Sequence, residues 1–300
     1  MVRTEAIQVW RGHKGAVYDL TWDSERRAWL SAGGDGVVAA WLPGEEHGTA
    51  VFQHASPFYA VSMWGGAMVG GNSNGSLFTA EGTEVRQFDV HKGPVLALGT
   101  SQSGLHVSGD AYGLLCLWSA EGGRLEMQHA CATTFGKIRH IAPHPEGMLL
   151  ATGSGQVVVM SNDGKVVSAI QAHTRSGYWA SIHPTKSVTL STGQDGELVV
   201  HDGHQEVLSM PVHKSAVYRG WIDGELLWTA GRDHDVKAWD LNTFDSVHKL
   251  HMPHNRSVNA LTFGGGEGGV LATAGDDRAV KIWRVNSASD HQRMGAPPQD

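Results

Sequence analysis

Three eleven-residue stretches decide the fold: SAGGDGVVAAW at 31–41, TAGRDHDVKAW at 229–239 and TAGDDRAVKIW at 273–283. Each begins with Ser or Thr, has Gly two residues later and Asp four residues later, and ends on Trp. Gly and Asp are typical of a tight turn, and the apolar segment before the Trp predicts a short strand. The chain therefore repeats a strand, a turn and a second strand that closes on Trp.

Outward from these stretches, a wider repeat covers nearly the whole chain. Most units open with a His, followed by small or polar residues and then an alternating apolar segment; these histidines are His13, His54, His91, His173, His213 and His254. A degenerate unit runs from about His129 through Ile138. The steps are 41, 37, 82 (two units), 40 and 41 residues, which gives seven units. A unit of about 40 residues is typical of one four-stranded propeller blade.

From about residue 6 to 285, the repeat resembles the WD-repeat (WD40) family. The resemblance implies an all-β fold, a single closed seven-bladed β-propeller with four-stranded antiparallel blades. It also implies that each blade is held by a hydrogen-bonded set, called a tetrad here: the opening His, a Ser or Thr on the second strand, an Asp in the following turn and a Trp on the third strand. Complete sets are His13, Ser31, Asp35 and Trp41; His213, Thr229, Asp233 and Trp239; and His254, Thr273, Asp277 and Trp283. Buried imidazoles and carboxylates are tolerated when each satisfies the other, so we expect these residues to be structural.

The remaining units depart from this pattern. The Trp position holds Ala80, Met160 and His201 in the second, fourth and fifth units, and the Asp position holds Asn74, Tyr112 and Ser154 in the second, third and fourth. We expect apolar packing to hold these blades, with the second and fourth the weakest.

The seventh unit lacks an outer strand after Trp283, whereas Ala6–Trp10 precede the first His and are spare. In the family the N-terminal strand completes the last blade, so the resemblance implies the same closure here. Closure removes the exposed sheet edges that invite aggregation. We expect one propeller domain at 1–286 and a disordered polar tail at 287–300.

Composition excludes several classes of function. The formal net charge of −7 argues against a protein that coats nucleic acid, because such binding needs Lys and Arg to neutralise phosphates. With only Cys116 and Cys131, neither a disulfide framework nor a four-cysteine zinc site is predicted. No signal-peptide pattern and no run of about 18 apolar residues is found. We therefore expect no membrane partner, a cytoplasmic location and a monomeric propeller.

The 18 histidines are candidate metal ligands or catalytic bases. His248, His251 and His254, and also His201 and His204, are spaced three residues apart, which places successive side chains on opposite faces of a strand. The Ser, His and Asp residues that converge belong to the tetrads, and a catalytic site is not normally repeated around a ring. We expect no metal, no cofactor and no catalytic residue.

Tyrosine is concentrated at one position of the repeat. In successive units the second residue of the innermost strand is Tyr18, Tyr59, Leu96, Arg139, Tyr178, Tyr218 and Asn259. In the family this position commonly points toward the mouth of the central channel, on the face where partners dock, called the top face. The fifth tyrosine, Tyr112, falls in a turn that opens on that face, so we expect all five to cluster. Tyrosine is enriched at binding hot spots because it buries a large area and keeps a polar tip.

Positive charge is expected beside these tyrosines. Lys137 and Arg139 on the fourth blade, with Arg175 and Arg232 in neighbouring loops, favour an acidic or phosphorylated peptide. The predicted partner-binding residues are Tyr18, Tyr59, Leu96, Tyr112, Lys137, Arg139, Tyr178, Tyr218, Arg232 and Asn259.

We therefore expect a non-enzymatic scaffold or adaptor that binds a peptide or protein on its tyrosine-lined top face. One alternative is a structural subunit of a larger complex that uses its rim, through apolar outer-strand residues such as Phe52, Phe88 and Met127. Another is an enzyme that uses the channel, which would need unpaired Asp, Glu, His or metal ligands at the mouth.

Overall fold

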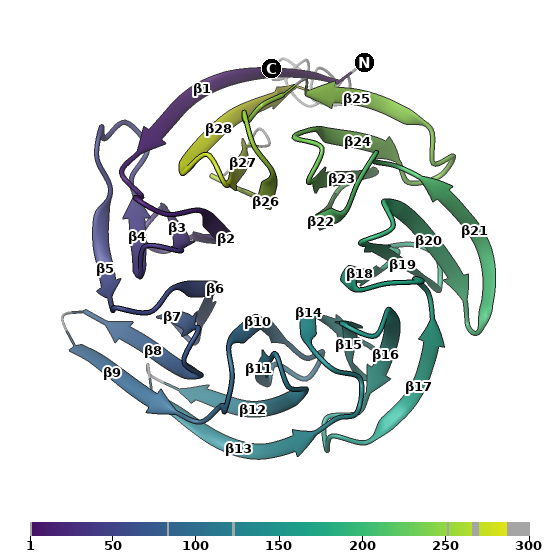
Figure 1. Cartoon of the computed structure of the whole chain (residues 1–300), viewed down its shortest axis with the longest axis horizontal. Coiled ribbons are helices and arrows are strands. Elements are labelled where there is room, and N and C mark those ends of the chain that lie inside the picture. Colours follow the sequence, from purple (N-terminus) through teal and green to yellow (C-terminus); the bar gives the residue numbers. More distant parts are fainter. Residues whose placement is uncertain (1, 83, 122–123, 251, 266–269, 287–300) are drawn as a thin grey trace, which may run out of the picture.

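The computed structural model describes residues 2–82, 84–121, 124–250, 252–265 and 270–286. Within them, strands β1 to β28 form seven four-stranded antiparallel sheets, arranged as blades around a central channel (Figure 1). The predicted seven-bladed propeller is confirmed. The predicted polar tail, 287–300, lies outside the described residues.

Blades 1 to 3 each use four consecutive strands, numbered from the channel outward. Blade 1 contains β2 (Val17–Asp23), β3 (Ala28–Gly33), β4 (Val37–Trp41) and β5 (Thr49–Gln53). Blade 2 contains β6 (Phe58–Trp64), β7 (Ala67–Asn72), β8 (Ser76–Glu81) and β9 (Glu84–Asp89). Blade 3 contains β10 (Val95–Thr100), β11 (His106–Asp110), β12 (Leu114–Glu121) and β13 (Arg124–Ala132).

Blades 4 to 6 follow the same plan. Blade 4 contains β14 (Ile138–His144), β15 (Gly147–Thr152), β16 (Gln156–Met160) and β17 (Val166–Gln171). Blade 5 contains β18 (Gly177–Ile182), β19 (Val188–Gly193), β20 (Glu197–Asp202) and β21 (Gln205–Pro211). Blade 6 contains β22 (Val217–Asp223), β23 (Leu226–Gly231), β24 (Val236–Asp240) and β25 (Ser246–Leu250).

Blade 7 joins the two ends of the chain, as predicted. It contains β26 (Val258–Gly264), β27 (Val270–Gly275) and β28 (Ala279–Asn286), and its outer strand is β1 (Arg3–Arg11). The pairing of β1 with β28 runs from Arg3 opposite Asn286 to Arg11 opposite Ala279 (Figure 1). Trp10 on β1 is buried in the cluster between blades 7 and 1, so this strand carries core packing as well as backbone hydrogen bonds.

The core lies between the blades. Every residue of β3, β7 and β15 is buried, because both faces of these strands pack against neighbouring sheets. The outer strands are largely exposed, as in β9 and β21. A sheet buried on both faces needs a continuous apolar run instead of an alternating one, which explains sequences such as Met148-Leu-Leu-Ala151 in β15.

Glycine is required at the turn that follows Asp35. Gly36 has a φ of +78°, and a Cβ at this position would lie 1.9 Å from the backbone oxygen of His54. A side chain there would therefore be strained and would also collide with the neighbouring backbone.

The three predicted tetrads form continuous hydrogen-bonded chains. In blade 6 the Trp239 indole donates a hydrogen bond to Thr229 Oγ1 at 2.9 Å. The His213 ring contacts the same hydroxyl through Nε2 at 2.9 Å, and it contacts Asp233 Oδ1 through Nδ1 at 2.8 Å. Blades 1 and 7 repeat this arrangement around Ser31 and Thr273. The hydroxyl is therefore the centre of each tetrad and satisfies two buried rings at once.

Blade 3 has an acid in contact with its opening His, although without the hydrogen bond of a complete tetrad, which corrects the interpretation that its acid was missing. The His91 and Trp118 rings both contact Ser108 Oγ, at 2.8 and 3.0 Å. The carboxylate beside His91 comes from Asp110, whose Oδ2 lies 3.3 Å from His91 Nδ1. Asp110 is two residues before Tyr112, which stands at the expected Asp position.

The reason is steric and can be seen at the equivalent residue of blade 1. Gly33 pairs with Val17 as Asp110 pairs with Val95. A Cβ on Gly33 would lie 2.3 Å from Asp35 Oδ1 and 2.4 Å from His13 Nδ1. The space beside the imidazole therefore accepts a carboxylate from either position, but not from both.

Blade 5 has three of the four tetrad residues. His173 contacts Asp195 and Ser191 at 3.0 Å, and His201 is buried where other blades have Trp. Blades 2 and 4 have no hydroxyl at the centre: Gly70 and Leu150 occupy the position that pairs with Val61 and Ile141. Packing replaces the tetrad in these two blades.

In blade 2 that packing is aromatic, because Phe52, Phe58 and Phe78 contact one another with ring centroids 5.3 to 6.1 Å apart. In blade 4, Leu150 is fully buried with Met148, Val158 and Met160.

Candidate functional site at the mouth of the channel

A β-bulge lies at the same place in the innermost strand of every blade. Pairing with the second strand skips one residue: between Val17 and Asp19 in blade 1, and between the equivalent residues of the other six blades. The skipped residues are Tyr18, Tyr59, Leu96, Arg139, Tyr178, Tyr218 and Asn259. Because a bulged residue leaves the regular ladder, its side chain can be aimed away from the packed faces of the blade.

All seven bulged residues line one cavity of about 590 Å³ at the channel mouth. The repeat position identified in the sequence therefore becomes a single surface contributed by all seven blades. The other residues of its lining are Pro94, Ala111, Lys137, Arg219 and Asp276.

The four mouth tyrosines form two edge-to-face pairs. Tyr18 and Tyr59 have ring centroids 5.0 Å apart, and Tyr178 and Tyr218 have centroids 5.1 Å apart. Burial raises the pKa of Tyr18 and of Tyr218, and the neighbouring tyrosine of each pair raises it further. These phenols therefore keep their protons at neutral pH and can donate hydrogen bonds.

Charge is distributed unevenly around the mouth. Arg139 lies over the Tyr178 ring, 5.0 Å from its centroid, next to Lys137. On the opposite side Asp276 accepts a hydrogen bond from Asn259 Nδ2 (2.7 Å), which also donates to the backbone oxygen of Val17 (3.0 Å). One side of the mouth is therefore cationic and the other is weakly acidic.

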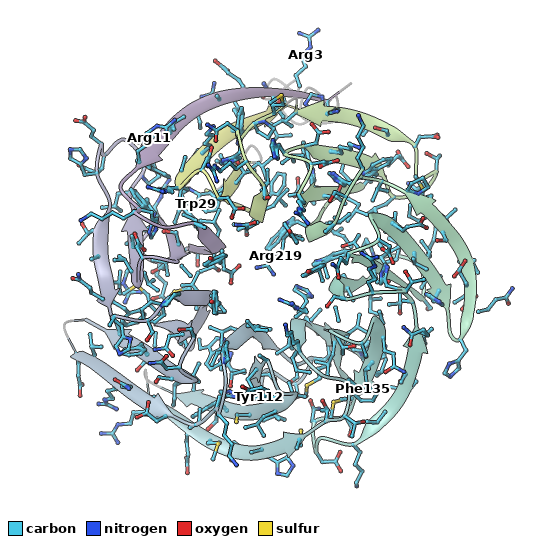
Figure 2. The ribbon with its side chains drawn as sticks, in the orientation of Figure 1. Arg3, Arg11, Trp29, Tyr112, Phe135 and Arg219 are labelled. Atoms are coloured by element: carbon cyan, nitrogen blue, oxygen red, sulfur yellow. The ribbon has the colours of Figure 1, made fainter. Side chains whose placement is uncertain are left out.

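An ion pair spans the channel below the tyrosines. Arg219 of blade 6 bonds Asp19 of blade 1, and Asp19 also accepts a hydrogen bond from the Val61 backbone N–H at 3.0 Å. Figure 2 shows Arg219 extending toward the centre of the ring. His140 occupies the same repeat position in blade 4, and burial, with the charge of Arg219, lowers its pKa to about 3. The acid and the imidazole at this level are thus either paired or uncharged at neutral pH.

The structure separates two predicted partner-binding residues from the rest. Tyr112 is 69% exposed and lies against Gly93 over blade 3 (Figure 2), and it does not line the cavity. Arg232 is exposed in a blade 6 turn and does not line it either. The expectation that all five tyrosines cluster was wrong for Tyr112.

Sequence reasoning missed Arg219 and Asp276. Arg219 stands one residue after the tyrosine position, where the other blades have Asp19, Ala60, Ala97, His140, Trp179 and Ala260. Opposite charges at one mostly apolar repeat position were the signal that could have identified the ion pair. No comparable signal marked Asp276, which is the residue before a tetrad acid.

Only one of the three rim residues expected from the sequence is well exposed on the rim. Phe52 is 2% exposed and belongs to the core, and Phe88 is half-buried against Trp118. Met127 is 48% exposed.

Across the described ranges, no three His, Cys, Asp or Glu side chains gather as they would around a metal ion. The part of the chain that the structure describes contains no helix of the length and apolarity that a membrane crossing needs.

The chain is similar to several known proteins over part of its length. It is 24% identical over 173 residues, 56% of this chain, to the ribosome biogenesis protein WDR12 homolog of Drosophila yakuba, and 25% identical over the same length to that of Drosophila erecta. It is 25% identical over 147 residues, 47% of this chain, to the 77 kDa echinoderm microtubule-associated protein of Lytechinus variegatus. The aligned regions cover 36%, 36% and 22% of those relatives, so the chain spans about a third or less of their length.

The sequence matches WD40 repeats, in agreement with the propeller fold. The model of the family described as "WD domain, G-beta repeat" matches residues 4–41, which contain most of β1 and the tetrad of blade 1, and residues 245–284, which contain the tetrad of blade 7. The two matched segments meet where β1 closes the ring. The chain carries WD40 repeats and folds as a seven-bladed propeller of the WD-repeat kind.

Proposed function

We propose that this protein is a non-enzymatic interaction module that binds a segment of a protein partner at the channel mouth. The observation that carries the proposal is the single cavity lined by the bulged residue of every blade, four of which are tyrosines. Tyrosine at that position belongs to neither the tetrad nor the core, because both are built from other residues.

The dimensions and chemistry of the mouth favour a peptide. A cavity of about 590 Å³ accommodates a few side chains and not a folded domain. Two tyrosine pairs offer apolar rings with hydroxyl donors on a rigid scaffold, a combination that limits the entropy lost on binding. Lys137 and Arg139 favour an acidic or phosphorylated segment on their side of the mouth.

The relatives support the coarser part of this proposal. Proteins named for ribosome biogenesis favour a role in a multi-protein assembly, although this chain spans only 36% of their length. A cytoplasmic location and a monomeric state stay predictions from the sequence.

The channel contacts favour binding over catalysis. Asp19 is held by Arg219, Asp276 is held by Asn259, and the low pKa of His140 makes it a poor base at neutral pH. The rim alternative is supported by Met127 and by scattered exposed valines such as Val166 and Val207.

Affinity capture from native lysate tests the proposal. The wild type is compared with a mouth variant in which Tyr18, Tyr59, Tyr178 and Tyr218 are all changed to Ala, with thermal melts of both. A matched rim variant changes Met127, Val166, Val207 and Val247 to Ala, all of which are exposed on outer strands.

We expect the mouth variant to fold and to lose a specific protein that the wild type and the rim variant retain. Loss in the rim variant alone, or the same captured set for all three proteins, would overturn docking at the mouth.

A further inference from the structure

A second cavity adjoins the mouth at blades 4 and 5. It measures about 810 Å³, and it shares Ala111, Lys137, Arg139 and Tyr178 with the mouth. The rest of its lining comes from the loops that open blades 4 and 5 and from the top turns of the same two blades, and it includes Phe135, Ser154, Arg175 and Gln194. One extended ligand can therefore occupy both cavities, crossing Tyr178.

The lining of this second cavity is cationic. It contains Lys137, Arg139 and Arg175 and no Asp or Glu, in a chain whose formal net charge is −7. Among the described residues, none of these three cations forms an ion pair. Three cations around a cavity without an acid in its lining create a positive potential that attracts an anion.

Arg139 is already held in position for such a ligand. Its guanidinium lies over the Tyr178 ring, and its Nε is buried without a hydrogen-bond partner. No acceptor among the described residues holds this guanidinium, so its terminal N–H groups are free to donate to an anion in the cavity.

The absence of acid follows from the way blade 4 is held. Blades 1, 5, 6 and 7 carry a carboxylate at the top turn, paired with the opening His. Blade 4 has Thr133 where those blades open with His, since its N–H donates to the Gly113 carbonyl as that of His54 donates to Gly36, and it has Ser154 where they have Asp. The blade 4 turn that would bring a negative charge to this cavity therefore brings the hydroxyl of Ser154 instead, and blade 5 adds the hydroxyl of Ser176 and the amide of Gln194.

We propose that the second cavity is a phosphoryl subsite, which binds a phosphorylated side chain of the peptide whose neighbouring residues occupy the tyrosine mouth. A phosphate monoester carries nearly two negative charges at neutral pH and three acceptor oxygens, which suits three cations better than one carboxylate does. This inference rests on the proposed function and specifies which chemical group the peptide presents.

Degenerate peptide pools provide the test. Four pools share random flanking positions and differ at one fixed central residue: phosphoserine, phosphothreonine, glutamate or serine. We expect the wild type to retain both phosphorylated pools about tenfold or more better than the glutamate and serine pools. Retention is expected to weaken below about pH 6, where the phosphate takes up its second proton.

Two variants locate the subsite. K137Q/R175Q is expected to reduce the phosphate preference to less than about twofold, since each lost cation removes a charge-assisted hydrogen bond. R256Q is the matched control, because Arg256 is an exposed top-face cation of blade 7 that does not line this cavity. R175Q alone, at an exposed residue, serves if the double variant melts early.

Equal retention of the glutamate and phosphorylated pools, or an undiminished phosphate preference in K137Q/R175Q, would overturn the phosphoryl subsite. The mouth variant separates this from the proposed function. If no pool is retained while lysate capture still depends on the tyrosines, the subsite is wrong and docking at the mouth stands. If neither lysate capture nor retention of the peptide pools depends on the tyrosines, the phosphoryl subsite and docking at the mouth are both wrong.

Discussion

Blades 1 and 3 each place a carboxylate beside the imidazole of their opening His, but from different positions in the repeat and with a hydrogen bond only in blade 1. In blade 1 it comes from Asp35, and Gly33 leaves room for it. In blade 3 it comes from Asp110, which occupies the position of that glycine, and Tyr112 stands where the acid would be. What is kept between blades is the location of the charged group, and the residue that supplies it can change.

That exchange alters the top face. Because Asp110 contacts the imidazole of His91, no acid is needed at position 112. The tyrosine at that position is 69% exposed. Blade 4 goes further and has neither a tetrad acid nor an opening His. The side of the ring formed by blades 5, 6, 7 and 1 keeps four turn carboxylates, whereas blades 2 to 4 have none at that position. The cationic cavity opens between these two regions.

The largest expected effect lies in blade 4, where packing replaces the tetrad. Leu150→Ala removes a fully buried side chain from the position that holds a hydroxyl in other blades. It should lower the free energy of unfolding by about 2–5 kcal/mol, measured by chemical denaturation. Val166→Ala, at a half-exposed residue of the same blade, is the control and should cost far less. Equal costs would mean that blade 4 is not held by its core.

The next effect concerns the centre of a tetrad. Thr229→Val preserves shape but leaves the rings of His213 and Trp239 without their shared hydroxyl. We expect a loss of about 1–3 kcal/mol by denaturant titration. The same exchange at exposed Thr49 should change stability little. If the two variants unfold alike, the tetrad contributes no net stability to blade 6.

Acid should act on tetrad blades through their carboxylates. Burial raises the pKa of Asp277, but the hydrogen bond and charge of His254 outweigh it and hold the pKa at about 2, below the ordinary 3.8. The stabilisation is therefore complete above about pH 4 and is lost as the pH falls through 2.

Asp277→Asn should cost about 1–2 kcal/mol at pH 7, and this cost should shrink toward zero near pH 2. Urea titrations of both proteins across this pH range measure the difference. A cost that does not change with pH would show that the carboxylate charge is not what stabilises blade 7.

The smallest expected effect is the net change in a double variant, which tests the comparison of blades 1 and 3 itself. Asp110→Gly alone should destabilise by about 1–3 kcal/mol, because the His91 imidazole loses its carboxylate. The double variant Asp110→Gly, Tyr112→Asp gives blade 3 the arrangement of blade 1. It should recover most of that loss and end within about 1 kcal/mol of the wild type, by thermal and denaturant melts. A double variant no better than the single one would contradict the exchange of positions.

The fold and the tyrosine-lined surface can be predicted from the sequence, because the same pattern occurs in seven repeats. The period predicts the blades, the spare segment before His13 predicts the closing strand, and the common position of four tyrosines predicts a shared surface. The bulges that aim these tyrosines are backbone features without a residue signature. Contacts between distant blades, such as Arg219 with Asp19, depend on ring geometry that one repeat cannot reveal.

The central claim is that partners dock at the mouth, and site-specific photo-crosslinking in native lysate tests it most directly. A benzoylphenylalanine is placed at Leu96, which lines the mouth, and in a second protein at Met127 on the rim. We predict that the protein captured by the wild type crosslinks at residue 96 and not at residue 127. Crosslinking at residue 127 with none at residue 96 would contradict the account and place the interaction on the rim.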